Sequence, residues 1–281
     1  SRAVGRLTRL LFAQGVAHPA TLAPLATGIL PIAFGEATKT VPFAVEGEKV
    51  YRFSVRWGAE TETDDAEGAV VATGEGRPTA AGIEALLPQF TGEILQVPPK
   101  FSAIKVDGER AYALARDGEE VVLEARPVVI DELRLIDVPD EDTAVLEARC
   151  GKGTYVRAIA RDLGRALGCR GHVVGLRRTR VGPFGEENAV SLDEIEDAAE
   201  AGEDLTPFLQ PVEVALGDIL EVNVTPSDAA NLAQGRSVLI RGRDAPVLGG
   251  AAYAMSKGRI VALGEIERGA LHPTRVFNFG G

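Results

Sequence analysis

The sequence is short of the residues from which many functional sites are built. It has two cysteines, Cys150 and Cys169, and three histidines among 281 residues. Two cysteines are too few for a disulfide scaffold, and we expect both to be reduced thiols in a cytoplasmic protein. No histidine stands at metal-ligand spacing to a cysteine or to another histidine, so the sequence predicts no zinc site.

Long apolar runs are also missing. No stretch approaches the roughly 18 consecutive apolar residues that a transmembrane helix needs, so no membrane partner is expected. The first residues, SRAVGRLTRLLFAQ, are interrupted by arginines, and no small-residue cleavage site follows them. This argues against a signal peptide. Together these absences predict a soluble, cytoplasmic protein.

A net positive charge is absent as well. The formal net charge is −11, which at first argues against a nucleic-acid partner. The charges are segregated, however. Residues 150–184 contain eight Lys or Arg and one acid, whereas residues 185–220 contain eleven acids and no Lys or Arg. A local basic surface can neutralise phosphates whatever the total charge, so both nucleic-acid binding and ordinary solvated surface charge stay open.

Periodicity predicts four helices. Apolar residues at helical spacing indicate a short amphipathic helix over residues 2–14, and Thr79 is placed to cap a second helix. The clearest pattern covers residues 155–167, where an apolar stripe lies beside arginines repeated every four residues. Gly168 is placed to end this helix. An acidic surface helix is expected over residues 191–204.

Alternation of polar and apolar residues predicts the strands. We expect strands over residues 51–58, 68–73 and 127–149, and a further strand over residues 29–34 after a loop rich in Gly, Pro, Ala and Thr. From about residue 218 onward, short β-like segments are separated by Gly-rich turns. Spacing and composition alone therefore indicate an α/β protein with a basic helix and a small C-terminal β domain.

Four sequence blocks carry more specific information. They are TLAPLATGILPIAFGEATKT at residues 21–40, the block from Lys49-Val50-Tyr51 to residue 68, PPKFSAIKVDGERAYALAR at residues 98–116, and CGKGTYVRAIARDLG at residues 150–164 with HVVGLRRTRVGPF at residues 172–184. In order and spacing they resemble bacterial tRNA pseudouridine-55 synthases of the TruB family. The resemblance covers the chain from its first residue to about residue 190.

The resemblance implies an α+β protein with the pseudouridine-synthase fold, in which helices flank a mixed, mostly antiparallel sheet. It implies a catalytic-type domain at residues 1–215 and a small PUA-like RNA-binding β domain at residues 216–281. The family also has an earlier strand and a D-K-P-x-G-x-T-S segment, whose last residue looks like Ser1. We therefore expect the first domain to be N-terminally truncated. The implied partner is the T stem-loop of tRNA, and a monomer is expected.

The chemistry that the resemblance implies is the isomerisation of uridine to pseudouridine. The enzyme flips a uridine out of the T-loop, because its glycosidic bond is unreachable inside a stacked loop. An aspartate then acts as the nucleophile, the N-glycosidic bond breaks, the base rotates, and a C–C bond forms. No metal or organic cofactor takes part.

Residue roles follow from the same motifs. Carried over by motif, Tyr51 stacks on the flipped base and Arg157 pairs with the aspartate. Tyr155 and Leu176 line the pocket, and His18 contacts the flipped-out loop. Without the motifs, Tyr51 is an ordinary strand aromatic and Arg157 an ordinary helix arginine, so these roles depend on the resemblance. The other expected substrate-binding residues are Thr21, Leu22, Lys49, Lys152, Arg177 and Arg178.

The position of the catalytic aspartate is occupied by Ala23. A methyl group cannot attack carbon, so we expect isomerisation to be abolished or severely impaired. Two glycines of the family loop are Ala17 and Ala20 here, and Pro19 restricts the conformation of His18. The departures are concentrated on the catalytic loop, while both flanks keep the family pattern.

Three hypotheses stay open. The first is a protein that binds the tRNA T-arm with little or no isomerisation, which includes a binding-only chaperone of tRNA folding. The second is an active synthase in which Asp64 or Asp65 replaces the missing nucleophile. The third is a non-RNA interaction protein whose acidic residues 186–218 form the partner surface. With alanine at position 23, we expect Arg157 to turn toward phosphate, solvent or another acid, because an unpaired buried charge is costly.

Overall fold

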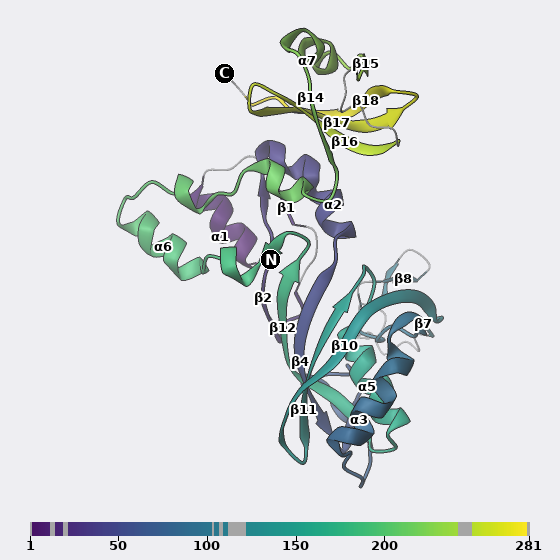
Figure 1. Ribbon diagram of the computed structural model, residues 1–281. Helices are drawn as coiled ribbons and strands as arrows, with labels where there is room; N and C mark the ends of the chain where they lie inside the picture. The colour runs from purple at the N-terminus through teal and green to yellow at the C-terminus, as the bar shows by residue number, and fades with distance from the viewer. Residues whose placement is uncertain are drawn as a thin grey trace. The chain divides into compact units, whose positions relative to one another are not determined.

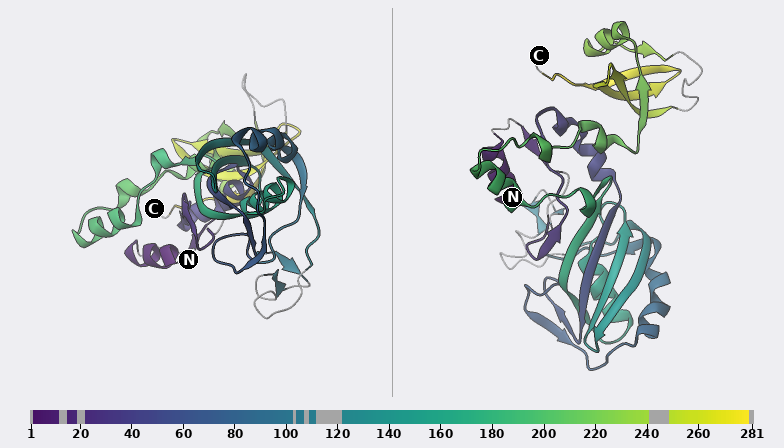
Figure 2. Two further views of the ribbon diagram at one scale, coloured as in Figure 1. Left: turned by 90° about the horizontal axis from the view of Figure 1, so that it is seen from below. Right: turned by 60° about the vertical axis from the view of Figure 1, so that its left-hand side comes forward.

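The computed structural model describes most of the chain as two compact units. The described residues are 2–11, 15–18, 22–102, 104–106, 109–111, 122–240 and 249–279. One unit, the terminal unit, contains residues 1–21, 31–45 and 189–281, and the other, the central unit, contains residues 22–30 and 46–188. The two units are described separately below (Figures 1 and 2).

The central unit is built on a seven-stranded sheet (Figure 1). The strands run in the order β13-β12-β4-β11-β10-β7, and β2 is added beside β12. Only the β2–β12 pair is parallel, so the sheet is mixed and mostly antiparallel, as predicted. The strands are β2 (Ala26–Gly28), β4 (Lys49–Trp57), β7 (Gly92–Gln96), β10 (Arg126–Asp140), β11 (Thr143–Cys150), β12 (Gly171–Val181) and β13 (Phe184–Gly185).

Helices α3 (Ala80–Leu86) and α5 (Val156–Ala166) cover one face of this sheet (Figure 2). Between them and the strands lies the main core, which contains Phe53 of β4, Leu146 of β11 and Ile159 of α5. Successive side chains of a strand point to opposite faces, so every second residue of β4 is buried under the helices. A side chain on this helix-facing side of the sheet is therefore shielded from water.

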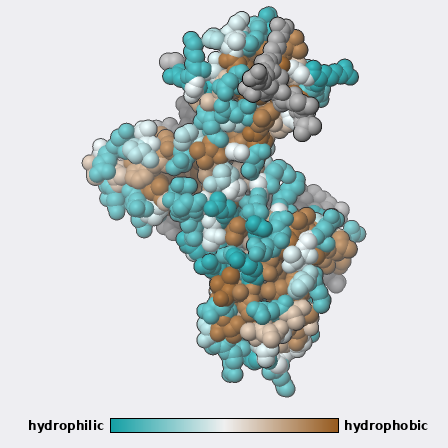
Figure 3. Space-filling model, viewed as in Figure 1, coloured by the Kyte–Doolittle hydropathy of each residue, from teal (hydrophilic) through white to brown (hydrophobic). Residues whose placement is uncertain are grey.

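The opposite face of the sheet is open to solvent. There Arg52 of β4 donates to Glu147 of β11 at 3.1 Å across the strands. Leu95, which is 74% exposed, and Val129 are apolar residues of β7 and β10 that reach the surface. Apolar patches are visible on the surface of the molecule (Figure 3). The outer face thus carries both charged and apolar groups in contact with water. Titratable side chains on the helix-facing side lie beside the buried core.

A hairpin places an acidic loop against the sheet. Strands β5 (Ala59–Thr61) and β6 (Val70–Thr73) pair with each other, and the loop between them returns to β12. Val173 N donates to Asp64 O at 3.1 Å, and Ala66 N donates to Val173 O at 2.9 Å. The remaining short elements of this unit are η2 (Leu87–Phe90), β8 (Lys105–Val106), β9 (Glu109–Arg110) and η3 (Glu186–Asn188).

The terminal unit joins the start of the chain to its second half. Helix α6 is held at its first turn by a capping box between Ser191 and Glu194, and Arg6 of α1 forms an ion pair with Glu196 of α6. Strands β1 and β3 pair with each other. The elements are α1 (Arg2–Leu10), β1 (Val16–Ala17), β3 (Ala33–Phe34), η1 (Gly35–Thr40), α2 (Val41–Glu46), α6 (Leu192–Glu200), η4 (Thr206–Phe208) and η5 (Val212–Leu216).

The C-terminal part of this unit is a five-stranded sheet in the order β14-β16-β17-β18-β15. One face packs on Leu232 of α7, and the other buries Tyr253 and Leu263 against Leu216. The elements are β14 (Leu220–Asn223), α7 (Pro226–Ala233), β15 (Val238–Leu239), β16 (Gly250–Ser256), β17 (Arg259–Glu267) and β18 (Ala270–Val276). The predicted C-terminal β structure is confirmed, whereas a domain boundary between residues 215 and 216 stays a prediction.

Two predicted helices are confirmed with their end signals. Thr79 accepts a hydrogen bond from Gly82 N at 3.1 Å and caps α3. Helix α5 ends before Gly168, whose φ of +72° suits a residue without a side chain. None of the helices in the described part of the chain has the length and apolar composition of a membrane-spanning helix.

The single strand predicted over residues 29–34 is wrong. Strand β2 ends at Gly28, which has a φ of +97° and lies so close to Arg178 O that no Cβ fits there. Pro31 follows and cannot donate to a strand ladder. Strand β3 then forms separately at Ala33–Phe34. The conformation of this segment is determined by backbone contact with β12, which is distant in sequence. A run of apolar residues gives no information about such a contact.

A glycine in α5 is required by close packing. A Cβ on Gly164 would overlap with Gly171 N, whereas a Cβ on Gly5 of α1 would have no atom within 4 Å. We expect Gly164→Ala to lower the free energy of unfolding by about 1–3 kcal/mol, because the start of β12 must move away. Gly5→Ala is the control and should raise it by about 0.5–1 kcal/mol. Urea unfolding measures both, and equal effects would contradict the packing.

Candidate functional site

The segment that carries position 23 is held against β12 by its main chain. Ala26 N donates to Ala23 O at 2.9 Å, and β2 then pairs in parallel with residues 176–178 of β12. Leu22 and Ala23 are both partly buried, while Thr21 lies outside the described residues. Position 23, at which the motif resemblance predicts the nucleophile, is thus fixed next to the strand that carries Leu176 and Arg178.

Tyr51 lies on the helix-facing side of β4, directly opposite Ala148 of β11 and Arg178 of β12. It is partly buried and packs against the same core as Leu25 and Leu176. Burial raises the pKa of the Tyr51 phenol, and the neighbouring Arg178 guanidinium opposes that effect. The phenol is therefore neutral at physiological pH. The structure brings the two predicted pocket residues, Tyr51 and Leu176, together beside the segment with position 23.

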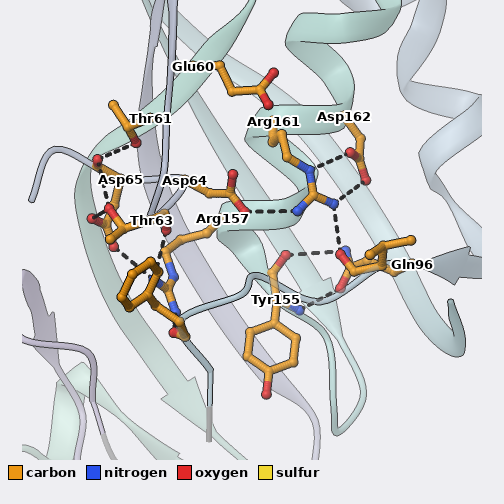
Figure 4. A network of polar contacts seen from close by, with 12 residues as sticks. Glu60, Thr61, Thr63, Asp64, Asp65, Gln96, Tyr155, Arg157, Arg161 and Asp162 are labelled. Carbon is orange, nitrogen blue, oxygen red and sulfur yellow. Dashed lines mark hydrogen bonds and ion pairs between the residues drawn. The ribbon is translucent and has the colours of Figure 1, made fainter. Parts of the chain in front are cut away.

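Arg157 projects from the first turn of α5 into a set of acceptors (Figure 4). Its Nη1 donates to Asp65 Oδ2 at 3.0 Å and to Thr63 O at 2.9 Å, and its Nη2 donates to Phe101 O at 2.9 Å. The expectation that Arg157 finds another acid is confirmed, and the acid is Asp65. The guanidinium therefore has a carboxylate partner and two carbonyl partners although position 23 carries no carboxylate.

Two further arginines of α5, Arg161 (Figure 4) and Arg165, repeat this arrangement. Arg161 Nη1 donates to Asp64 Oδ2 at 2.8 Å, and Arg165 Nε donates to Glu60 Oε2 at 2.9 Å. Residues four apart lie on one side of a helix, so the acidic loop can meet all three arginines at once. We call the three pairs the ion-pair ladder: Arg157–Asp65, Arg161–Asp64 and Arg165–Glu60.

The ion-pair ladder corrects the expectation of a basic surface on this helix, because the arginines repeated every four residues are neutralised by acids. Lys152 and Arg177, which were expected to bind substrate, also meet acids. Lys152 Nζ lies 2.6 Å from Glu46 Oε2, and Arg177 pairs with Glu186. Both of these pairs are exposed to solvent. Since exposed pairs contribute little free energy, they can open to a phosphate, whereas the ladder is fixed.

Asp64 is the most strongly perturbed carboxyl of the ladder. Burial raises the pKa of Asp64 from 3.8 to about 6, against the opposing effect of Arg161. Arg161 also donates to Asp162 Oδ1 at 2.8 Å, so one guanidinium is shared by two carboxyl groups. Because the folded protein binds this proton more tightly than the unfolded chain does, the contribution of Asp64 to stability falls as pH rises from about 4 to about 6.

Replacing Asp64 tests this linkage. Asp64→Asn removes the titration but keeps the size of the side chain, and Arg161 retains Asp162. We expect the free energy of unfolding of Asp64→Asn, relative to the unmodified chain, to rise between pH 4 and pH 6 and to level off above pH 7. Urea unfolding across this range measures it. A difference that does not depend on pH would contradict the burial of the Asp64 charge.

Gln96, at the end of β7, clamps the main chain of Tyr155 (Figure 4). Its Oε1 accepts from Tyr155 N at 2.8 Å, and its Nε2 donates to Tyr155 O at 3.2 Å. Gln96 is 3% exposed. Tyr155 is the N-cap residue of α5 and has no side-chain cap of its own, so Gln96 supplies the missing partner. The clamp fixes Tyr155 and, two residues later, Arg157.

The clamp needs an amide rather than a carboxylate. In Gln96→Glu, an ionised oxygen would face Tyr155 O without a proton to share. We expect a loss of about 1–3 kcal/mol in the free energy of unfolding at pH 7. The loss should shrink at low pH, where the protonated acid donates as the amide does. The exposed Gln89→Glu is the control and should stay within about 0.5 kcal/mol. Equal losses for both variants would contradict the clamp.

Two of the predicted substrate-binding residues are buried cations beside Tyr51. Lys49 and Arg178 are 5% and 1% exposed. Lys49 Nζ donates to Gly47 O at 2.6 Å. Burial lowers the pKa of Lys49, and the positive charge of Arg178 adds to this effect. Arg178 Nε donates to Ile29 O at 2.8 Å. Both cations therefore lie inside the site rather than on its rim.

His18 belongs to the terminal unit, where it follows β1. It is partly buried, and its Nδ1 has no hydrogen-bond partner among the described residues. Within those residues, no group of His, Cys, Asp or Glu side chains is placed to hold a metal ion. The groups that prediction from the sequence missed are Asp65, as the partner of Arg157, and Gln96. The match between acids at positions 60–65 and arginines every four residues was the available signal for the first.

Comparison with known proteins identifies the family. A model described as "TruB family pseudouridylate synthase (N terminal domain)" matches residues 8–156, and one described as "tRNA pseudouridylate synthase B C-terminal domain" matches residues 157–217. A protein of Bradyrhizobium diazoefficiens named tRNA pseudouridine synthase B is 57% identical over 285 residues, covering 100% of this chain and 83% of the relative. The chain belongs to the TruB family. A relative of the same name from Rhodopseudomonas palustris is 56% identical and covers 100% of this chain and 78% of its own.

Solved structures confirm the fold of this TruB family member. A chain in a Cbf5-Nop10-Gar1 complex matches 98% of this chain and 79% of its own, with a TM-score of 0.74 and 23% identity. A chain in an H/ACA RNP bound to a substrate RNA containing 2'-deoxyuridine matches 99% of this chain and 80% of its own length, with a TM-score of 0.74 and 22% identity. The predicted α+β fold of the pseudouridine synthases is therefore confirmed. The TruB family consists of tRNA-binding isomerases that act in tRNA processing.

Proposed function

We propose that this chain binds the T stem-loop of tRNA at a base-flipping site and that, with Ala23, it has little or no synthase activity. The observation that carries the proposal is an alanine at the nucleophile position in a TruB family member that is 57% identical to a named synthase over its whole length. The proposal is supported by a site in which Tyr51, Leu176 and Arg157 keep ordered partners.

In the proposed site, the flipped uridine stacks on Tyr51 and contacts Leu176. Tyr51 is suited to this role because it is held rigidly in the middle of a central strand and its phenol stays neutral. Tyr155 lines the pocket from the start of α5, where Gln96 fixes its main chain. Arg157 is held beside the pocket by its ion pair with Asp65. These groups bind and orient the base but provide no nucleophile.

The reaction of the family stops at its first covalent step in this proposal. That step is attack by an aspartate on carbon, with cleavage of the N-glycosidic bond. Ala23 offers only a methyl group. Removing the nucleophile of an enzyme that works by covalent catalysis typically lowers the rate by several orders of magnitude, because binding and orientation alone remain. The flipped base should therefore be bound but left unchanged.

Replacement of the nucleophile by Asp64 or Asp65 is disfavoured by their surroundings. Both side chains are buried, with 5% and 1% exposure. Asp65 Oδ2 accepts from Arg157, and its Oδ1 accepts from Thr63 Oγ1 at 2.6 Å and from Glu67 N at 3.0 Å. Asp64 Oδ2 likewise accepts from Arg161. Either carboxylate would have to leave the ion-pair ladder before it could attack a ribose or a base.

Binding in this proposal does not depend on the chemistry. Lys152 and Arg177 are exposed and would exchange their acid partners for phosphates. The five-stranded C-terminal sheet would act as the PUA-like RNA-binding module, with the proposed domain boundary at residues 215 and 216. A protein that holds the T-arm without modifying it can assist tRNA folding, so a binding-only chaperone role follows from the same surface.

Restoring the carboxylate tests the proposal. We expect Ala23→Asp to form pseudouridine in an unmodified tRNA, while the unmodified chain forms none even at stoichiometric concentration and after long incubation. Ala23→Asn is the control, because it has the same shape but no nucleophile, and it should stay inactive. Pseudouridine formation by the unmodified chain would show that another residue carries the attack.

Direct binding of the T stem-loop separates the remaining hypotheses. Binding by the unmodified chain, the Asp variant and the Asn variant with similar affinity supports the proposed function. Failure of the unmodified chain to bind any tRNA would favour the non-RNA interaction protein, with acidic residues 186–218 as the partner surface. Binding without rescue by Ala23→Asp would show that the altered loop, and not only the missing carboxylate, prevents the reaction.

A further inference from the structure

Arg178 is a buried guanidinium with an unused donor. It is 1% exposed, its Nε donates to Ile29 O at 2.8 Å, and its Nη2 is buried without a hydrogen-bond partner among the described residues. No carboxylate in the described part of the chain forms an ion pair with it. This differs from Arg157, whose guanidinium donates to the Asp65 carboxylate and to two carbonyl groups.

The strand register explains why Arg178 is inside the protein. Arg177 faces Arg52 on the outer side of the sheet, so the next residue, Arg178, points to the helix-facing side and lies opposite Tyr51. Parallel pairing with Gly28 and the Nε–Ile29 bond then hold the guanidinium in place. It cannot swing out to water without separating β2 from β12.

A buried cation without an anion is unfavourable, and a guanidinium is a strong donor to oxyanions. The positive charge of Arg178 lies close enough to Lys49 to lower the pKa of Lys49 in addition to the larger effect of burial, so two cations lie near one another here. The place of the unused donor also matters, because Tyr51 is the residue on which the flipped nucleotide would stack. A nucleotide bound there brings its own phosphate with it.

We propose that Arg178 is an anion-binding residue of the site and that its Nη2 donates to a phosphate group of the flipped nucleotide. This inference rests on the proposed function. Arg178 recognises a phosphate oxygen, not the base, so it fixes the nucleotide backbone while Tyr51 holds the base. Tyr51 lies opposite Arg178 and is only partly buried, so a phosphate would reach Nη2 from the side of Tyr51.

The test is a double-mutant cycle between Arg178 and single phosphates. Arg178→Met keeps the length of the side chain and removes its charge. Its affinity for a T stem-loop RNA should fall about 10- to 100-fold, as expected when a charged hydrogen bond is lost. The RNA is then made with a neutral methylphosphonate at one phosphate next to the target uridine. That change should weaken binding to the unmodified chain but should not weaken binding to Arg178→Met further.

Arg52→Met is the matched control, because it removes the same charge from the outer face of the neighbouring strand. It should change the affinity less than about threefold. Arg178→Met should also reduce the magnitude of the slope of the logarithm of the RNA-binding constant against the logarithm of the salt concentration by about 1, as expected for the loss of one phosphate contact. Unchanged affinity of Arg178→Met, or losses that add independently at every phosphate tested, would overturn the proposal.

A structural role alone predicts a different pattern. The Tm of free Arg178→Met should be unchanged or higher, because the charge that is removed has no anion in the free protein. A large drop in Tm with affinity unchanged after correction for unfolded protein would show that Arg178 is only a packing residue. Arg178→Lys keeps a cation and should keep the salt slope of the unmodified chain, which distinguishes loss of charge from loss of fold.

Inorganic phosphate provides an arm that needs no RNA. At matched ionic strength, phosphate in place of chloride should raise the Tm of the unmodified chain and leave that of Arg178→Met unchanged. If the chain binds no tRNA but shows this difference, the proposed function fails and the anion site stands. If the chain binds tRNA but shows neither this difference nor coupling to a phosphate, the anion site fails and the proposed function stands.

Discussion

Burial of guanidinium groups between α5 and the acidic loop of residues 60–65 is the constraint on which the rest of the site depends. A buried arginine without an anion is costly. The ion-pair ladder places Arg157 and Arg161 beside carboxylates, and the more exposed Arg165 pairs with Glu60 on the same side of the helix. The ladder fixes α5 against the β5–β6 hairpin. Gln96 holds the main chain of Tyr155 just before this helix begins. Together, the ladder and Gln96 determine where Tyr155 and Arg157 lie relative to β4.

The same constraint explains how the chain can keep its fold with alanine at position 23. If a carboxylate at that position were the only partner of Arg157, its loss would leave an uncompensated buried charge and destabilise the site. Asp65 and two carbonyl oxygens meet the guanidinium instead. The ion pair that stabilises Arg157 therefore does not depend on the residue at position 23.

Local patterns were enough to predict what depends on local physics. The apolar stripe and Gly168 predicted α5, and Thr79 predicted the start of α3, because caps and periodicity act within a few residues. The strand over residues 29–34 was predicted wrongly, since the break at Gly28 is imposed by a strand 150 residues away. For the site, motif resemblance predicted that Tyr51 and Leu176 belong together. The resemblance did not predict that the arginines of α5 pair with acids, because the motif does not show which segment packs against the helix.

Arg157 and Arg178 show two outcomes of placing a guanidinium under the same helices. The first lies beside an acidic loop and is neutralised within the chain, so it stabilises the fold and leaves little attraction for a ligand. The second is locked by Gly28 and Ile29 at a junction of three strands, where no described carboxylate reaches it. A fold that carries such an unpaired charge is less stable than it could be. An unpaired Arg178 charge is useful if a ligand brings an anion to it. The charge destabilises the free protein, but its pairing with the anion would stabilise the complex.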